Sequence, residues 1–392
     1  MRFGHGGWFD KAAPNIVYSP ISRPGYSRGG AAARLPKFPP AGRPSLRCAI
    51  RNAKPEPVVS RPVVLLVDHS IQPQAREMLS KTCEVRVLDG YPSEATLVKE
   101  MAEADAMLAR LVKITKPALD AAKKIKLIAC HGVGVDRLDL AHATSLGIVV
   151  TTTGDANAAA VAEYTFGLML GLLRMVPAAD ARMRTGAWSR NALIGPELEG
   201  RTLGLVGLGA IGTRVARQAL GFRMRVISYD PNVPAPPPGL DVAMVPFEKL
   251  LAESDIVSLH PRLNGGNFHM IDAKALGAMK KTACLINTAR GELVDESALI
   301  AALQSGQIAN AALDVFEKEP HPENSPLRQM PNVLLSPHVA GQTHEALVKI
   351  AICGAEQILD ALAGKQPRYV YNPEVYEIRK KLAAQQPAKV QA

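Results

Sequence analysis

A run of six residues has the spacing of a phosphate-binding turn: Gly207-Leu208-Gly209-Ala210-Ile211-Gly212. It follows an apolar segment, residues 202–206, that we expect to be a strand, and it opens a helix expected over residues 213–221. In such a turn the first glycine permits the tight bend, the second lets the backbone approach a pyrophosphate, and the third lets the helix pack against the strand. Free amides and the positive end of the helix dipole then face the anion. The motif therefore predicts a dinucleotide site.

An acidic residue after the next strand supports this prediction. Asp230 ends a second apolar segment, residues 225–229, and lies 18 residues after Gly212. A carboxylate there can accept hydrogen bonds from the ribose hydroxyls and repels a 2′-phosphate, so the sequence favours NAD over NADP. Because Asp230 precedes Pro231, an ordinary turn after the strand is the alternative. Arg225 lies nearby and weakens the preference for NAD.

Three later segments each carry a charged side chain just past an apolar strand. They are residues 285–291, 312–320 and 334–341. Their charged residues include Arg290, Glu319 and His338. In an open α/β sheet, ligands bind at the edge formed by the carboxyl ends of the strands. We therefore expect these side chains to lie at a ligand site.

The elements that must position these residues alternate along the chain. Apolar strands are expected over residues 63–67, 84–88, 106–109, 127–129 and 148–150. Helical segments such as residues 73–81 separate them, and a long apolar helix over about residues 157–175 leads into the second series. This alternation predicts an α/β fold with two doubly wound parallel sheets. The proline-rich run 234–238 is expected to be a surface loop.

The sequence resembles the D-isomer-specific 2-hydroxyacid dehydrogenases over residues 63–373. The resemblance rests on the glycine turn with Asp230, on the three charged segments in the family's order, and on two further motifs, His131-Gly132-Val133-Gly134-Val135-Asp136 and Ala160-Val161-Ala162-Glu163. It implies a flavodoxin-like substrate domain, a Rossmann NAD-binding domain and a cleft between them. We expect the substrate domain over residues 60–153 and 337–375, the NAD-binding domain over 154–336, a basic disordered extension over 1–59 and a tail over 376–392.

The resemblance also implies the catalytic roles. His338 would protonate the carbonyl oxygen as hydride reaches the adjacent carbon, work that suits a side chain whose ordinary pKa lies near neutrality. Glu319 would orient that imidazole and favour its charged form. The family's acid directly precedes a proline, which selects Glu319 rather than Glu317. Arg290 would bind the substrate carboxylate, because a planar guanidinium matches that planar anion.

Further binding residues follow from motif position within the family. Backbone amides of Val133 and Gly134 would complete the carboxylate site. Asp314 would accept a hydrogen bond from the nicotinamide carboxamide, and Thr288 and Gly341 would also border the cofactor.

The substrate is either a phosphorylated or an unphosphorylated 2-oxo acid, as in D-3-phosphoglycerate dehydrogenase or in hydroxypyruvate and glyoxylate reductases. Arg110 and Lys113 fall in the loop where the phosphoglycerate enzymes bind phosphate, but Cys130 stands where those enzymes commonly carry an arginine. Only 54 residues follow His338, so we expect no additional regulatory domain.

Two other histidines have alternative interpretations. His131 precedes the carboxylate loop and is either a substrate contact or an internally satisfied loop residue. His260 closes the strand expected over residues 256–259 and is expected to border the cofactor cleft. The family often shows a proline two residues after His260, whereas this chain has Pro261-Arg262.

The formal charge of +10 is concentrated at the N-terminal end. Residues 1–57 contain ten basic and two acidic side chains, so the remaining 335 residues carry only +2. A nearly neutral body lacks the basic face needed to bind nucleic acid. The arginine-rich, acid-poor extension resembles an organelle transit peptide, and a disordered tail or a misplaced start codon are the alternatives.

The remaining composition indicates a soluble protein from a reducing compartment. The five cysteines are scattered and form no disulfide framework or Cys/His cluster, so no metal is predicted. The longest apolar stretch, residues 164–173, is far shorter than the roughly 20 residues that cross a bilayer. We expect the cytoplasm, or the matrix of a plastid or mitochondrion if residues 1–57 are a transit peptide.

The apolar helix with residues 160–173 resembles the family's dimer contact and predicts a homodimer, with burial in the protein's own core as the alternative. An NAD(H)-sensing interaction protein, like the related corepressors, is the alternative to the dehydrogenase, and feeble turnover would distinguish it.

Overall fold

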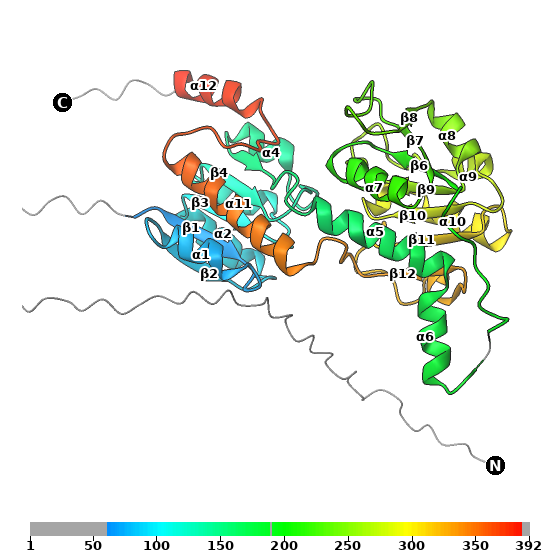
Figure 1. The fold of residues 1–392 in the computed structure, drawn as a ribbon. Coiled ribbons are helices and arrows are strands. Elements are labelled where there is room, and N and C mark those ends of the chain that lie inside the picture. Colours follow the sequence, from blue (N-terminus) through cyan, green and yellow to red (C-terminus); the bar gives the residue numbers. More distant parts are fainter. Residues whose placement is uncertain (1–60, 189, 386–392) are drawn as a thin grey trace, which may run out of the picture. The chain divides into compact units, whose positions relative to one another are not determined.

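The computed structural model describes residues 61–188 and 190–385. The basic extension and possible transit peptide predicted for residues 1–59 lie outside the described residues, as do the last seven residues of the predicted tail. The predicted α/β class with two parallel sheets is confirmed (Figure 1).

Five parallel strands form the first sheet in the order β2-β1-β3-β4-β5. The strands are β1 (Val63–Val67), β2 (Glu84–Leu88), β3 (Ala106–Ala109), β4 (Leu127–Cys130) and β5 (Val149–Thr151). This is the flavodoxin-like order. Strands β3 and β4 are completely buried, which explains why their sequences are continuously apolar rather than alternating.

Helices from both ends of the described chain cover this sheet. They are α1 (Pro73–Leu79), α2 (Glu94–Glu103), α3 (Lys116–Ala121), α4 (Leu140–Ser145), α11 (His344–Leu362) and α12 (Val375–Gln385). Helices α2, α3 and α4 pack on one face, and α1 and α11 on the other. Ala351, Ala355 and Ile358 of α11 are completely buried in the same cluster as Val64 and Leu66 of β1. The first sheet therefore completes its core with residues from the far end of the chain.

Asn372 fastens the C-terminal segment to the first sheet. Its buried side chain accepts a hydrogen bond from the Val150 amide at 2.8 Å and donates to the Ile148 carbonyl at 3.0 Å and the Thr144 hydroxyl at 2.8 Å. Leaving such buried groups without partners costs about 1–3 kcal/mol each. Helix α12 is anchored as well, because Arg379 donates to the carbonyl of Gly147 at 2.7 Å, so this part of the expected tail is bound to the fold.

Seven parallel strands form the second sheet in the order β12-β11-β10-β9-β6-β7-β8. The strands are β6 (Thr202–Val206), β7 (Arg225–Tyr229), β8 (Ala243–Met244), β9 (Ile256–Leu259), β10 (Cys284–Asn287), β11 (Asn310–Leu313) and β12 (Val333–Leu335). This is the Rossmann order with one additional strand at the edge. The proline-rich run 234–238 lies in the loop between β7 and β8, as predicted.

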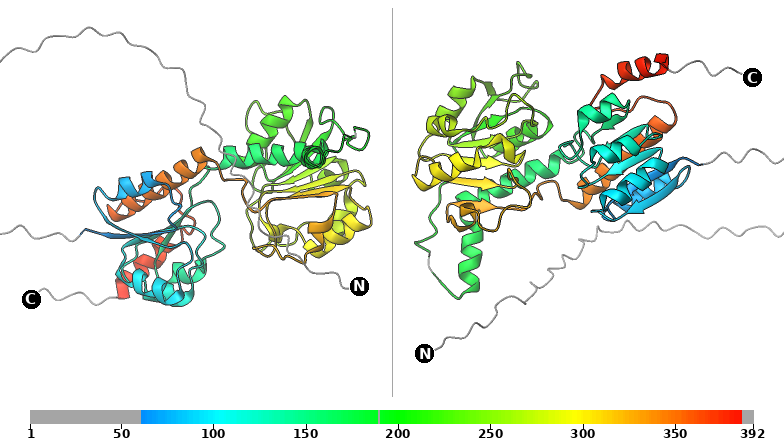
Figure 2. Two further views of the ribbon diagram at one scale, coloured as in Figure 1. Left: turned by 90° about the horizontal axis from the view of Figure 1, so that it is seen from below. Right: turned by 180° about the vertical axis from the view of Figure 1, so that it is seen from behind.

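Helices cover both faces of the second sheet (Figure 2). They are α5 (Ala158–Leu173), α7 (Ala210–Gly221), α8 (Phe247–Glu253), α9 (Ala273–Ala278) and α10 (Glu296–Gln304), with short 3-10 turns η1 (Gly291–Leu293) and η2 (Pro326–Gln329). Helices α5 and α7 pack on one face, and α8, α9 and α10 on the other.

Helix α5 is a core helix. Nine of its 16 residues are buried, and it packs against α7 and the strands β10, β11 and β12. This favours the alternative interpretation of its apolar sequence. Helix α6 (Val176–Arg184) differs, because it contains no buried residue and extends away from the sheet (Figure 1).

No single helix among the described residues has the length and apolar composition of a membrane span. Helices α5 and α6 have that length and apolar composition only if they are counted together across the 62° bend between them.

Candidate active site

A large cavity brings together the site residues predicted from sequence. Of those fifteen residues, all except Gly212 line it: Arg110, Val133, Gly134, Gly207, Gly209, Ala210, Ile211, Asp230, Thr288, Arg290, Asp314, Glu319, His338, Gly341. The cavity takes residues from the ends of β3 and β4 in the first sheet and of β6, β7, β10 and β11 in the second. The carboxyl ends of the strands therefore meet at one place, as expected for parallel sheets.

Each glycine of the turn has a distinct local environment. Gly207 has φ +93°, a left-handed conformation that favours glycine. A Cβ atom on Gly212 would overlap the Gly207 carbonyl oxygen, so Gly212 serves close packing of helix on strand and lies outside the cavity lining. A Cβ on Gly209 would meet no atom within 4 Å, so this backbone is open toward a ligand. These environments fit a pyrophosphate-binding turn.

The helix that follows the turn begins earlier than predicted. Helix α7 starts at Ala210, with Gly209 as its N-cap, rather than at Thr213. The amides of the motif itself therefore form the positive end of the helix, which brings the dipole to the open backbone of Gly209.

Asp230 supports the glycine turn from the end of β7. Its Oδ2 accepts a hydrogen bond from the Leu208 amide at 2.9 Å, and its Oδ1 accepts one from the Asn232 amide at 2.9 Å. Arg225 instead donates to Glu253 at 2.7 Å and does not line the cavity. The carboxylate at this position therefore has no cation from Arg225 beside it that would attract a 2′-phosphate.

His338 and Glu319 form a hydrogen-bonded pair. The Nδ1 atom of His338 lies 2.9 Å from Oε2 and 3.1 Å from Oε1 of Glu319. Burial would raise the pKa of Glu319, but the hydrogen bond and charge of His338, together with the Phe316 amide and the Arg137 charge, hold that pKa below its ordinary value. The His338 side chain is half exposed to the cavity. A carboxylate thus faces one ring nitrogen and leaves the other for a ligand.

A buried carboxylate shapes the loop that carries His338. The side chain of Asp314 is completely buried and accepts hydrogen bonds from the Val339 amide at 2.9 Å, the Ala340 amide at 2.8 Å and the Ser336 hydroxyl at 2.6 Å. The His338 amide donates to the Asp314 carbonyl at 2.7 Å. Asp314 therefore organises this loop as well as bordering the cavity, a function that its motif position did not reveal.

Arg290 is oriented by a residue of the first sheet. Its Nε donates to Asp136 Oδ2 at 2.9 Å, and its NH1 group donates to the Ala289 carbonyl at 2.7 Å. A Cβ atom on Gly134 would overlap the guanidinium, so the loop approaches Arg290 closely. Among the described residues, the amides of Val133 and Gly134 have no hydrogen-bond acceptor. Cationic and amide donors thus converge, as the binding of a carboxylate requires.

Arg110 is already paired within the protein. Its guanidinium lies 3.6 Å from Asp68 Oδ2, and it donates to the Ser70 hydroxyl and, at 3.2 Å, to Gln342 Oε1. Lys113, which falls in the same loop, is exposed and does not line the cavity. The charge of Arg110 is therefore balanced by a carboxylate before any substrate binds.

Two further histidines at the cavity are buried. Burial, with a smaller effect of the Arg110 charge, lowers the pKa of His131 to about 4. Burial lowers the pKa of His260 to about 3, and its Nε2 lies 2.9 Å from the Ser258 hydroxyl. Both imidazoles are therefore neutral at physiological pH.

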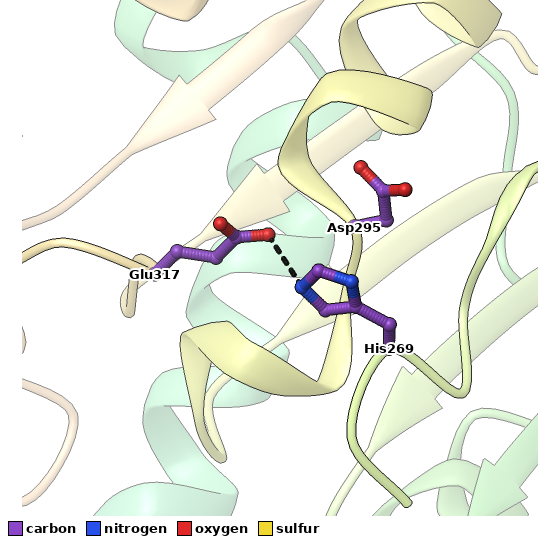
Figure 3. A group of neighbouring side chains, drawn as sticks. All are labelled: His269, Asp295 and Glu317. Carbon is purple, nitrogen blue, oxygen red and sulfur yellow. Dashed lines mark ion pairs between the residues drawn. The ribbon is translucent and has the colours of Figure 1, made fainter.

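One group of side chains has the residue types of a metal site. His269, Asp295 and Glu317 place one potential ligand atom each within 4.8 Å of the others (Figure 3). However, Glu317 Oε1 lies 2.9 Å from His269 Nε2, and Asp295 Oδ1 accepts the Ala298 amide at the start of α10. Glu317 therefore lies beside the imidazole, and Asp295 caps α10.

Residues 166–340 match the family described as D-isomer specific 2-hydroxyacid dehydrogenase, NAD binding domain. A glyoxylate reductase from Thermofilum pendens is 41% identical over 82% of this chain and 97% of its own length. The chain belongs to this family. A D-3-phosphoglycerate dehydrogenase from Methanocaldococcus jannaschii is 39% identical over 79% of this chain and 59% of its own length. The crystal structure of a glyoxylate reductase from Paecilomyes thermophila is 30% identical, with a TM-score of 0.74 over 81% of this chain and 99% of that one.

This 2-hydroxyacid dehydrogenase is an oxidoreductase that acts on the CH–OH group of 2-hydroxy acids with a nicotinamide dinucleotide. The open backbone of Gly209 at the start of α7 fits such a dinucleotide. The comparisons agree with the dehydrogenase interpretation of the sequence rather than with the NAD(H)-sensing alternative.

Replacement of Gly209 tests the dinucleotide turn. Gly209→Ala adds a methyl group where the protein itself leaves room, so we expect wild-type stability but an NADH dissociation constant raised at least about tenfold, because a pyrophosphate must approach this backbone. Fluorescence titration with NADH measures the constant. Gly221→Ala, at the other end of α7 and equally uncrowded, is the matched control. Wild-type affinity in Gly209→Ala would contradict the assignment.

Proposed function

We propose that this protein catalyses reversible hydride transfer between NADH and a small unphosphorylated 2-oxo acid, with hydroxypyruvate and glyoxylate as its substrates. The observation that carries the proposal is the presence of the His338–Glu319 pair and the Arg290 guanidinium in the same cavity as the glycine turn. The similarity to glyoxylate reductases supports it.

The proposed proton donor is His338. When bound, the nicotinamide supplies the hydride that reaches the carbonyl carbon. Protonated His338 gives its proton to the carbonyl oxygen as the C=O double bond becomes an alcohol, and neutral His338 recovers that proton in the oxidation. Glu319 remains ionised in the neutral range because its pKa is held below the ordinary value, and this charge stabilises the imidazolium.

The proposed carboxylate site consists of Arg290 and the loop amides. Because Asp136 takes the Nε–H of Arg290, the terminal NH2 group next to Gly134 is directed at the substrate. The amides of Val133 and Gly134 donate to the same carboxylate. These hydrogen bonds fix the carbonyl group of the substrate next to His338. Such positioning lowers the entropic part of the activation barrier to hydride transfer.

The proposed dinucleotide site combines the turn with residues near the nicotinamide. Thr288 and Gly341 border the cofactor, and Asp314 accepts the carboxamide N–H, since carboxylate oxygens can accept more than one hydrogen bond. Asp230 accepts from the ribose hydroxyls, and the pairing of Arg225 with Glu253 supports a preference for NAD over NADP.

The substrate and the dinucleotide are proposed to bind to two different domains. Residues 60–153 with 337–375 form the substrate domain, and residues 154–336 form the NAD-binding domain. The separate buried clusters of the two sheets support this division. The basic, acid-poor composition of residues 1–57 supports a transit peptide and thus an organelle matrix as the compartment.

Substitutions in the acid–base pair test the chemistry. His338→Gln should lower kcat for hydroxypyruvate at least about a hundredfold, because general acid catalysis contributes that much or more. Glu319→Gln should lower kcat less and move the high-pH loss of reduction to lower pH, since the imidazolium loses its stabilising charge. Absorbance at 340 nm follows NADH, and NADPH should support slower turnover. Full activity in His338→Gln, with NADH binding intact, would refute the role.

Comparison of substrates tests the pairing of Arg110. Because Asp68 balances this arginine, we expect kcat/KM for 3-phosphohydroxypyruvate to lie below that for hydroxypyruvate. Asp68→Asn removes the balancing charge and should raise kcat/KM for the phosphorylated acid about tenfold, with little change for glyoxylate. Asp89→Asn, which alters an exposed ion pair with His69, is the control. A wild-type preference for the phosphorylated acid would overturn the substrate assignment.

A homodimer is proposed to form through α6 and the segment that follows it rather than through α5. Four large apolar side chains in this region are exposed: Val176, Met183, Trp188 and Ile194. Exposed apolar groups gathered in one region are typical of subunit interfaces.

Light scattering should therefore give twice the chain mass of 41.9 kDa. Ile194→Glu should shift the protein toward the monomer, because a charge in an apolar interface loses its hydration. Leu382→Glu, on α12, should leave the mass unchanged. A wild-type monomer would contradict the dimer.

A further inference from the structure

The side chains in Figure 3 connect two segments that carry proposed catalytic residues. Glu317 lies two residues before Glu319, and Glu292 lies two residues after Arg290. His269, on the loop that precedes α9, contacts both segments. Its Nε2 lies 2.9 Å from Glu317 Oε1, and its backbone amide donates to the Glu292 carbonyl at 2.8 Å.

A reciprocal pair of hydrogen bonds fixes Glu317 further. The Glu317 amide donates to Glu296 Oε2 at 2.9 Å, and the Glu296 amide donates to Glu317 Oε1 at 2.9 Å. Glu296 is the first residue of α10, which Asp295 caps. The segment before Glu319 is therefore held to a helix end at two atoms.

The two segments also touch through their backbones. A Cβ atom on Gly291 would overlap the Phe316 carbonyl group and the Glu317 amide. Because glycine alone permits this approach, the chain after Arg290 and the chain before Glu319 lie in direct contact. The contact with Gly291 therefore holds the backbone that leads from Phe316 to Glu319.

Several carboxylates lie near His269. Glu296 and Glu317 are neighbouring carboxylates, and burial together with the Glu317 charge raises the pKa of Glu296, against a lowering by the Glu317 amide. Asp295 adds a third carboxylate, and His321 Nδ1 lies 3.8 Å from Glu296 Oε1. His269 places its imidazole beside Glu317 where the two segments meet.

We propose that His269 and Glu317 are positioning residues, which hold the Phe316–Glu319 backbone against the Arg290 segment so that Glu319 meets His338. This proposal rests on the proposed function, because it assigns His338 and Glu319 as the acid–base pair. Glu317 thus serves the reaction through Glu319, without contact to substrate or cofactor.

Steady-state kinetics of single variants test the proposal. His269→Asn and Glu317→Ala should each lower kcat for hydroxypyruvate about tenfold, since poorly placed acid catalysts lose part of a contribution of about 100-fold or more. The high-pH loss of reduction should move to lower pH, as in Glu319→Gln. The NADH dissociation constant should stay within about twofold, because the glycine turn lies elsewhere. Glu317→Gln keeps an acceptor for the Glu296 amide and should retain more activity than Glu317→Ala.

A matched control and a double variant separate positioning from general stability. His142→Asn removes another histidine–carboxylate pair, with Asp120 at 2.7 Å, far along the chain on α4, and should leave kcat unchanged. In a Glu319→Gln background, Glu317→Ala should have no further effect on kcat, because both act through one residue. Circular dichroism checks folding, and His269→Asn decides if Glu317→Ala does not fold.

The outcomes are distinguishable. Turnover by the unaltered protein establishes the proposed function by itself. Folded His269→Asn and Glu317→Ala with wild-type kcat and pH dependence would overturn the positioning role while leaving the dehydrogenase assignment intact. Independent, multiplicative losses in the double variant would also overturn it.

Discussion

The buried carboxylate of Asp314 is the constraint on which the site depends. It lies at the end of β11 and accepts two loop amides and one hydroxyl from residues 336–340. These bonds hold the loop in a shape that puts His338 at φ +55°, a left-handed conformation that is costly for a residue other than glycine. A buried charge persists only when its hydrogen bonds are satisfied, so the loop and the carboxylate require each other. The hydrogen bonds of Asp314 therefore fix the turn that carries His338, the proposed acid–base residue, and Glu319 lies within hydrogen-bonding distance of its imidazole.

Burial lowers the pKa of two histidines at the cavity. His131 and His260 lose their charged forms because the protein removes water from them. His338 is half exposed and has a carboxylate partner, which gives it both water and a compensating charge. Both arginines have carboxylate partners within the protein, Arg290 with Asp136 and Arg110 with Asp68. The cavity thus holds its arginines in pairs with carboxylates rather than presenting a broadly basic surface.

Local patterns in the sequence were sufficient for the strands, the glycine turn and the three charged segments, because apolar runs and glycine spacing reflect short-range physics. Helix α5 shows a limit of this approach, since an apolar helix is equally typical of a core and of an interface, and only the structure shows its packing against α7. The partners of Arg290 and Arg110 could not be predicted, because Asp136 lies 154 residues from Arg290 and Gln342 lies 232 residues from Arg110. The early start of α7 was missed because Ala210 and Ile211 were assigned to the turn, although both have helical backbone.

The return of α11 to the first sheet has a consequence for synthesis of the chain. Strand β1 emerges from the ribosome first, yet its core includes Ala351, Ala355 and Ile358. The second sheet, by contrast, has all its strands once residue 335 is made. Domains usually fold in the order in which they are translated. In this chain the first sheet is synthesised first, but apolar residues on one of its faces remain uncovered until α11 is made. By then all strands of the second sheet have been synthesised. The nascent chain is therefore most in need of a chaperone between the synthesis of β5 and that of α11.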